Sequence, residues 1–190
     1  MPNSSYVITA LPVVVPLGLV AFAILLWRLY RAAALAVPRA AVLAVLCVYG
    51  AGVVANTVLP ITVGGPRYAE PWQGHLNLTL LVNTDTGDML QNVAVFMPLG
   101  FLLPLVSRVE ALRQVLLCGF LVSLAMEAVQ FANALLAVGG HVADINDLLA
   151  NTLGAPLGYG LFRAALLVPG ADRMIRAAAW PARSREEARV

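Results

Sequence analysis

Five polar side chains interrupt the last apolar part of the chain at spacings that could form a binding or catalytic site. Glu127 and Gln130 lie three residues apart in one apolar run, and Asp144, Asp147 and Asn151 open the next. Spacings of three and four place side chains on one face of a helix. A carboxylate in a bilayer costs several kcal/mol, so acids retained there indicate function. Such groups can bind a polar ligand, act as general acid and base, or hold a divalent metal.

The composition identifies the class of protein. Of 190 residues, 61% are hydrophobic and 12% are charged, whereas soluble domains carry about 25% charged residues. The chain is therefore expected to be an integral membrane protein. All 12 basic residues are arginines, and together with the many Ala, Val and Leu residues they favour a bacterial host, hence its plasma membrane. No nucleic-acid partner is expected.

Five apolar stretches are each long enough to cross a bilayer, which takes about 20 residues. They cover roughly residues 7–27, 40–63, 89–106, 115–138 and 148–168. Arginines follow the first, third and fifth stretches, and Arg67 alone falls on the opposite side. The positive-inside rule then places the N-terminus outside and the C-terminus in the cytoplasm. We predict an all-α, polytopic transmembrane helix bundle of about five spans.

Three regions follow from this pattern. Residues 1–39 form an N-terminal transmembrane anchor with a basic cytoplasmic loop, 40–169 form the main transmembrane domain, and 170–190 form a basic cytoplasmic tail.

The candidate site residues are expected at one depth. The fourth span runs outward and the fifth runs inward, so Glu127 and Gln130 meet Asp144, Asp147 and Asn151 in the outer leaflet. Asn92, near the start of the third span, falls in the same layer. We therefore predict a polar pocket that opens outward, with His141 at its edge. Close packing beside it is predicted from the GxxxG spacing of Gly154 and Gly158. In the third span, Pro98, Gly100 and Pro104 predict a kink or a break.

The combined order of these residues resembles the VanZ-like family. The matching positions are Asn92, Phe96, Pro98, Gly100, Phe101, Glu127, Gln130, Asp144, Asp147, Asn151 and Gly154, and Asn77 resembles an upstream element. The resemblance implies a multi-spanning membrane protein, and the family's founding member is associated with resistance to teicoplanin. Family members commonly carry an arginine where His141 stands here. If that position binds an anion, a histidine would bind it more weakly than an arginine near neutral pH, because it is charged only part of the time.

Each residue also has a plain structural interpretation. Glu127 and Gln130 could fix helix packing by hydrogen bonds between helices. Asp144 could be an exposed loop acid that caps the fifth span, and Asp147 could be its N-cap. Other structural roles are packing for Asn151, a helix bridge for Asn92, a solvated loop position for His141, and helix shape or close contact for Phe96, Pro98, Gly100, Gly154 and Gly158.

Three functions remain open on the sequence. The first is binding of an amphiphile, such as a membrane lipid or a lipid-linked cell-wall precursor, which would affect tolerance to teicoplanin-type antibiotics. The second is a membrane-embedded enzyme that acts on an envelope lipid, with Glu127, Asp144 and Asp147 as candidate catalytic groups. A divalent metal could be held by these three acids and His141. The third is a proton-coupled transporter. The sequence decides neither enzymatic activity nor oligomeric state.

Overall fold

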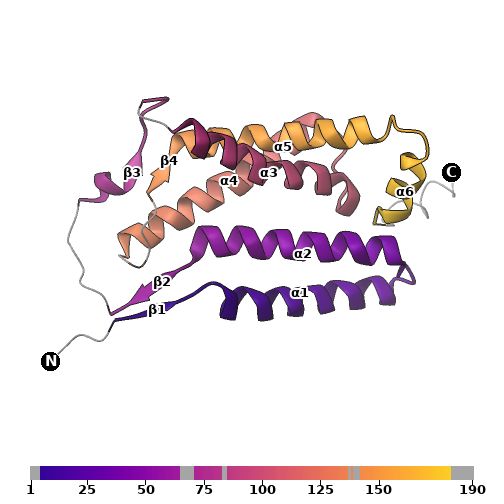
Figure 1. The fold of residues 1–190 in the computed structure, drawn as a ribbon, viewed down its shortest axis with the longest axis horizontal. Helices are drawn as coiled ribbons and strands as arrows, with labels where there is room; N and C mark the ends of the chain where they lie inside the picture. Colours follow the sequence, from indigo (N-terminus) through magenta and orange to yellow (C-terminus); the bar gives the residue numbers. More distant parts are fainter. Residues whose placement is uncertain (1–4, 65–70, 83–84, 137, 139–141, 181–190) are drawn as a thin grey trace.

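The computed structural model describes residues 5–64, 71–82, 85–136, 138 and 142–180 as a bundle of long helices with a short helix across one end (Figure 1). The helices are α1 (Leu11–Arg31), α2 (Val37–Val58), α3 (Thr86–Val106), α4 (Leu112–Leu135), α5 (Ile145–Ala165) and the short α6 (Ala171–Ala178). The predicted all-α class is confirmed.

Four of the long helices, α1 to α4, are long and apolar enough to cross a membrane. The fifth, α5, is as long as α3, with 21 residues in each, and runs the length of the bundle beside α3 and α4 (Figure 1). It carries more polar and small residues because much of its surface faces protein. Its buried face comprises Asn146, Ala150, Asn151, Gly154, Ala155, Gly158, Tyr159 and Phe162. Five helices therefore occupy the predicted positions, and four of them qualify as spans by composition.

The helices after α1 begin earlier than the apolar stretches suggest. Their first residues are Val37, Thr86, Leu112 and Ile145, where the apolar stretches start at 40, 89, 115 and 148. The difference arises because a helix's first turn leaves backbone N–H groups without partners inside the helix, and polar residues satisfy them. At α3, for example, the carboxylate of Asp85 accepts the N–H of Gly87 at 2.7 Å.

Short strands join the helices at the end of the bundle opposite α6. Strand β1 (Tyr6–Ile8) pairs antiparallel with β2 (Ile61–Val63). After the 3₁₀ helix η1 (Trp72–His75), β3 (Leu76–Asn77) pairs in parallel with β4 (Ala143–Asp144). The second pair connects the loop before α3 to the start of α5, next to the predicted site.

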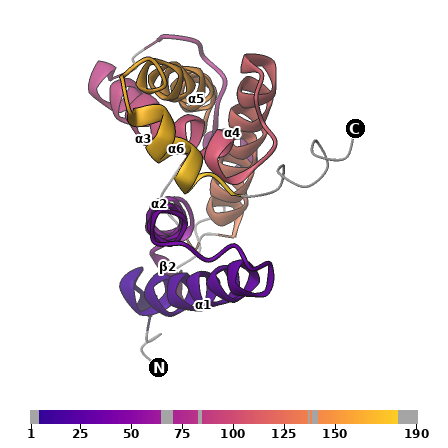
Figure 2. The ribbon, with the colours of Figure 1, turned by 90° about the vertical axis from the view of Figure 1, so that its right-hand side faces the viewer.

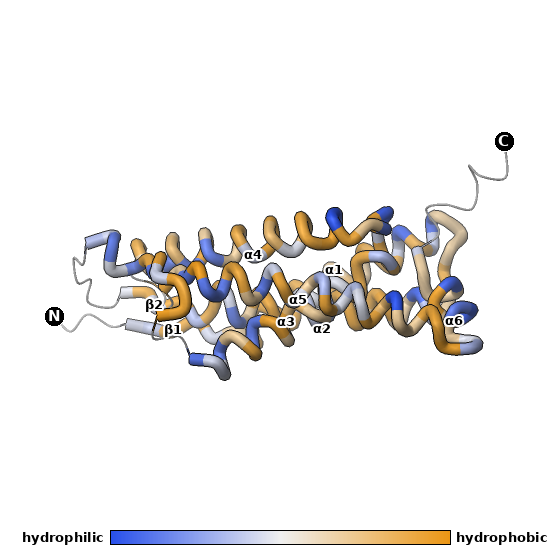
Figure 3. Tube along the Cα trace, turned by 90° about the horizontal axis from the view of Figure 1, so that it is seen from above, coloured by the Kyte–Doolittle hydropathy of each residue, from blue (hydrophilic) through white to orange (hydrophobic). Residues whose placement is uncertain are grey.

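The described arginines lie at one end of the bundle and most of the described acids toward the other, with Glu110 and Asp172 as the exceptions. The described arginines lie at one end, here called the basic end: Arg28, Arg31, Arg39, Arg108, Arg113, Arg163, Arg173 and Arg176. Asp85, Asp88, Glu127, Asp144 and Asp147 lie toward the other, called the acidic end. Figure 3 shows hydrophilic residues near both ends of the bundle and mostly apolar ones between. This is the charge separation on which the positive-inside prediction depends.

The bundle has two packing units. In the first, α1 packs on α2 around Leu29, Ala34 and Leu43. In the second, α3, α4 and α5 pack around an apolar core formed by Leu102, Leu105, Val115, Ala155, Tyr159 and Phe162. Figure 2 shows α1 and α2 on one side, α3 to α5 on the other, and α6 crossing the basic end.

Glycines bring the α3 and α5 backbones into contact, and this confirms close packing at Gly154 and Gly158. A Cβ added to Gly158 would lie 1.8 Å from the carbonyl oxygen of Met97, and one on Gly154 would lie 2.3 Å from that of Val93. The relation is reciprocal, because a Cβ on Gly100 would lie 1.8 Å from the carbonyl oxygen of α5 residue Ala155. Only glycine permits this approach from both sides.

Helix α3 continues through both of its prolines. Pro98 and Pro104 lie inside one helix from Thr86 to Val106. Of the predicted alternatives, a kink or a break, the break is therefore wrong, and Pro98 lines an apolar cavity instead of ending the helix.

Candidate functional site

The buried carboxylate of Glu127 connects α4 to the start of α5. Its Oε2 accepts the backbone N–H of Asp144 at 2.8 Å, while the structure gives Oε1 no partner among the described residues. Glu127 is an acidic residue and yet only 8% exposed, and most of the other residues of α4 are apolar. The expected hydrogen bond between helical segments is confirmed, and it uses one of the two carboxylate oxygens.

Asp144 is the N-cap of α5, which confirms the predicted capping role of Asp144, while the alternative N-cap, Asp147, is wrong because it lies in the first turn of the helix. The Oδ1 of Asp144 accepts the N–H of Asn146 at 2.7 Å, as an N-cap side chain does. Asp144 is half-buried and not fully exposed. The periodicity argument placed the start of the helix at 148, about one turn too late, which is why Asp147 was predicted as its N-cap beside the capping role of Asp144.

Asp147 lies in the first turn of α5 and holds α3. Its Oδ1 accepts a hydrogen bond from Nδ2 of Asn92 at 2.6 Å. The predicted role of Asn92 as a bridge between helices is confirmed. Asp147 and Glu127 thus bind α5 to different neighbours, α3 and α4, at the same end of the bundle.

Sequence reasoning missed Asn146, which is 1% exposed. Its Oδ1 accepts the N–H of Leu81 at 2.9 Å, and its Nδ2 donates to the carbonyl of Thr79 at 2.9 Å and to Asp144 at 2.8 Å. Asn77 also donates to Asp144, at 2.8 Å. Asn146 lies off the helix face shared by the acids, so periodicity passed over it. The available signal was the apolar loop 76–82, whose backbone groups need partners wherever they are buried.

We call these hydrogen-bonded residues the polar cluster: Asn77, Asn92, Glu127, Asp144, Asn146 and Asp147. Their amide groups donate toward the carboxylates and the loop backbone. The sequence prediction that α3, α4 and α5 bring polar groups to one level is confirmed by these bonds. These hydrogen bonds form two groups at the acidic end: one joins Asn77, Glu127, Asp144 and Asn146, and the other joins Asn92 to Asp147.

Three buried oxygens have no hydrogen-bond partner among the described residues: Thr57 Oγ1, Gln130 Oε1 and Asn151 Oδ1. Asn151 is 2% exposed and lies on the buried face of α5, one turn after Asp147. Gln130 follows Glu127 by one turn of α4. Leaving a buried acceptor unpaired costs about 1–3 kcal/mol, so each of these oxygens marks a place where a donor would be stabilising.

The chemistry of this region is dominated by acceptors. The carboxylates of Glu127, Asp144 and Asp147 adjoin the unpaired amide oxygens, and the described arginines lie at the other end. Within the described ranges, no group of three His, Cys, Asp or Glu side chains is arranged to hold a metal ion. His141, the fourth residue of the predicted metal set, lies outside the described residues, as does Arg67, so the metal prediction stays a prediction.

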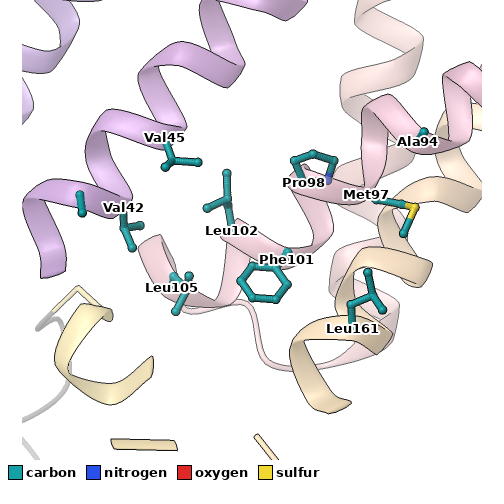
Figure 4. A pocket seen from close by; sticks show the side chains of 10 residues that line it. Val42, Val45, Ala94, Met97, Pro98, Phe101, Leu102, Leu105 and Leu161 are labelled. Atoms are coloured by element: carbon teal, nitrogen blue, oxygen red, sulfur yellow. The ribbon is translucent and has the colours of Figure 1, made fainter. Parts of the chain in front are cut away.

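An apolar cavity of about 560 Å³ lies elsewhere, between α2 and the α3–α5 pair (Figure 4). We call it the slot. Helix α3 lines it with one continuous stripe formed by Ala94, Met97, Pro98, Phe101, Leu102 and Leu105. Ala41, Val42 and Val45 of α2 and Leu161 of α5 complete it. The slot occupies the half of the bundle nearer the basic end, because its α2 residues are early in that helix and Leu161 is late in α5.

Comparison with known families assigns most of the chain to one of them. The family model described as VanZ/LLP1 matches residues 46–168, which is more than half of the chain and includes α3, α4, α5 and most of α2. No curated protein and no solved structure matches the chain. The matched segment contains the whole polar cluster and the reciprocal glycine contact, and the chain belongs to the VanZ-like family of membrane proteins.

Proposed function

We propose that this multi-pass membrane protein binds the head group of an envelope amphiphile at its acidic end. The observation that supports this most strongly is the unpaired Oδ1 of Asn151, buried in α5 one turn after Asp147. Helix packing alone gives no reason to leave that acceptor without a donor. A ligand group that donates hydrogen bonds would satisfy it.

The balance of donors and acceptors defines the class of ligand. The amides of the polar cluster donate inward to Asp144, Asp147 and the loop backbone, which leaves Glu127 Oε1, Gln130 Oε1 and Asn151 Oδ1 as acceptors. Sugar hydroxyls, ammonium groups and amide N–H groups match such a site. The ligand would be a glycosylated or amine-bearing amphiphile, such as a glycolipid, the sugar part of a lipid-linked cell-wall precursor, or a lipoglycopeptide antibiotic.

On this proposal the protein affects antibiotic tolerance by occupying or shielding that ligand. Under the topology predicted from the arginines, the acidic end faces outward. Teicoplanin-type antibiotics and mature cell-wall precursors are expected at that surface of a bacterial plasma membrane, so the site would meet them directly.

The test in cells uses a deletion strain of the host that expresses wild type or variants at matched membrane levels. Wild type is expected to raise the inhibitory concentration of teicoplanin. Glu127→Gln keeps one oxygen for the Asp144 N–H and replaces the other by an NH2 group, so it removes the charge and one acceptor. Glu127→Gln and Asn151→Ala are each expected to abolish the protection. Asp88→Asn, a change at an exposed acid of the same end, is the matched control and is expected to protect fully. Protection by Glu127→Gln equal to wild type would refute a functional carboxylate.

A binding test separates the ligand from the phenotype. Purified protein is heated with monoglucosyl diacylglycerol or with the same diacylglycerol lacking the sugar. We expect only the glycolipid to raise the unfolding temperature, and we expect the increase to disappear in Glu127→Gln and persist in Asp88→Asn. Equal shifts with both lipids would contradict recognition of the head group.

A further inference from the structure

The slot has a chemistry opposite to that of the polar cluster. Its lining side chains are apolar throughout, and two of them, Val45 and Leu161, are more than half exposed. A cavity of about 560 Å³ falls within the ~300–1,000 Å³ range of ligand sites. Since it opens on the side of a transmembrane bundle, its occupant reaches it from the bilayer.

Hydrogen bonds hold α2 to the rest of the bundle on both sides of the slot. At the basic end, two bonds connect α2 to α3 through the residues that follow α6. Nε of Arg39 in α2 donates to the carbonyl of Ala179 at 3.0 Å, and the N–H of the next residue, Trp180, donates to the carbonyl of Leu105 in α3 at 2.7 Å. At the acidic end, Nδ2 of Asn133 donates to the carbonyl of Val58 at 3.2 Å. The slot is therefore a bounded space between connected helices.

Each of the two main lining helices has an arginine just beyond the slot. Arg39 precedes the lining residue Ala41 in α2, and Arg108 follows the lining residue Leu105 of α3. Arg39 donates to two backbone carbonyls, those of Ala34 and Ala179, so its positive charge is not neutralised by those contacts. Among the described residues, the structure gives one ion pair, between Arg176 and Asp172.

We propose that the slot binds one acyl chain of an anionic phospholipid whose phosphate lies between Arg39 and Arg108. The apolar lining fits the chain, and the arginines at its basic end fit the phosphate. The site would be filled from the leaflet at the basic end, which the positive-inside rule assigns to the cytoplasm. This inference concerns the opposite end from the polar cluster and does not depend on the proposed function.

The first experiment measures retained lipid by native mass spectrometry after purification with phosphatidylglycerol or phosphatidylcholine. Wild type is expected to retain one phosphatidylglycerol preferentially. Ala41→Phe and Ala94→Phe fill the slot from α2 and α3 respectively, and each is expected to lower occupancy about tenfold by occupying its space. Ala23→Phe adds the same bulk to an exposed position on α1 and is expected to leave occupancy unchanged. Full occupancy in both slot variants, or retention of a second protein copy and no lipid, would overturn the proposal.

The head-group part has its own variants. Arg108→Gln is expected to lower the preference for phosphatidylglycerol over phosphatidylcholine about fivefold, which is the contribution of one cation near an anionic surface. Arg113→Gln removes the same charge from α4, which does not line the slot, and is expected to retain the preference. Equal losses in the two variants, or equal retention of both lipids by wild type, would refute recognition of the phosphate.

A third measurement avoids substitutions altogether. Phosphatidylglycerol carrying a photoreactive diazirine in one acyl chain is added to wild-type protein and illuminated. Adducts are expected to concentrate on Met97, Phe101 and Leu161. Adducts spread evenly over the outer faces of α1 and α4 would show that the slot holds no chain.

Discussion

Helix α3 meets its two neighbours in opposite ways. Toward α5 it presents Gly100 and the carbonyl groups of Val93 and Met97, so the backbones touch. Toward α2 it presents Ala94, Pro98 and other apolar side chains around an open slot. The first interface leaves no room for a methyl group, whereas the second leaves room for a ligand.

The two interfaces also differ in polarity along the bundle. The α3–α5 interface ends in the hydrogen bond from Asn92 to Asp147, and the slot lies nearer the arginines of the basic end. One helix therefore supports a fixed polar site and an adaptable apolar one. The tight α3–α5 interface is the one that must keep its hydrogen-bond geometry, because buried polar groups that lose some of their partners are costly.

The largest expected effect comes from adding one methyl group to the tight interface. Gly158→Ala would place a Cβ 1.8 Å from the carbonyl oxygen of Met97, so α3 and α5 must separate. We expect a loss of more than about 3 kcal/mol of stability, measured by thermal unfolding in detergent. The control is Gly160→Ala, whose added Cβ meets nothing within 4 Å. Equal unfolding temperatures for the two variants would contradict the backbone contact.

The next effect concerns the buried amide that holds the loop before α3. Asn146→Ala removes the acceptor for the Leu81 N–H and the donor to Thr79, and we expect a loss of about 2 kcal/mol. Amide hydrogen exchange should accelerate in residues 76–82 and not elsewhere. A general loss of helix packing would instead accelerate exchange in the helices as well. Asn56→Ala, at an exposed asparagine that bonds its own helix, should change stability by less than about 0.5 kcal/mol.

Substitutions of Glu127 separate its contribution to stability from its contribution to ligand binding at the acidic end. Glu127→Ala removes the acceptor for the Asp144 N–H and should cost about 1–2 kcal/mol. Glu127→Gln retains an acceptor oxygen and should cost less than half of that. Thermal unfolding of both variants measures the difference. If Gln destabilises as much as Ala, the charge itself holds α4 to α5, and Glu127→Gln is then no longer a clean test of ligand binding.

The smallest expected effect is at the slot. Ala94→Phe adds far more volume than Gly158→Ala, yet Ala94 is exposed and lines open space. In detergent without added phospholipid, we expect its stability to lie within about 0.5 kcal/mol of wild type. A loss comparable with that of Gly158→Ala would show that α2 and α3 pack as tightly as α3 and α5.

The sequence predicted the helices and much of the polar site because membrane periodicity and charge leave strong signals. Glu127, Asp147 and Asn92 were found because each interrupts an apolar run or repeats at helix spacing. The error at Asp147 has a local cause, since the polar first turn of α5 concealed where the helix begins. Asn146 was missed because its partners are backbone groups of a loop about 65 residues earlier in the chain, and no pattern along one helix reveals them.

The slot could not have been predicted in the same way. Its lining residues are ordinary apolar residues with the spacing of any membrane helix, and what distinguishes them is the distance at which α2 is held. That distance depends on contacts such as Arg39 to Ala179, residues 140 positions apart. Three-dimensional placement, and not residue type, separates a lipid-facing stripe from a cavity wall.

The reciprocal glycine contact also has a mechanical consequence. Each backbone occupies the notch left by a missing side chain on the other, so α3 and α5 cannot slide lengthwise without first coming apart. The pair should behave as one stiff beam that carries the acids at a fixed spacing.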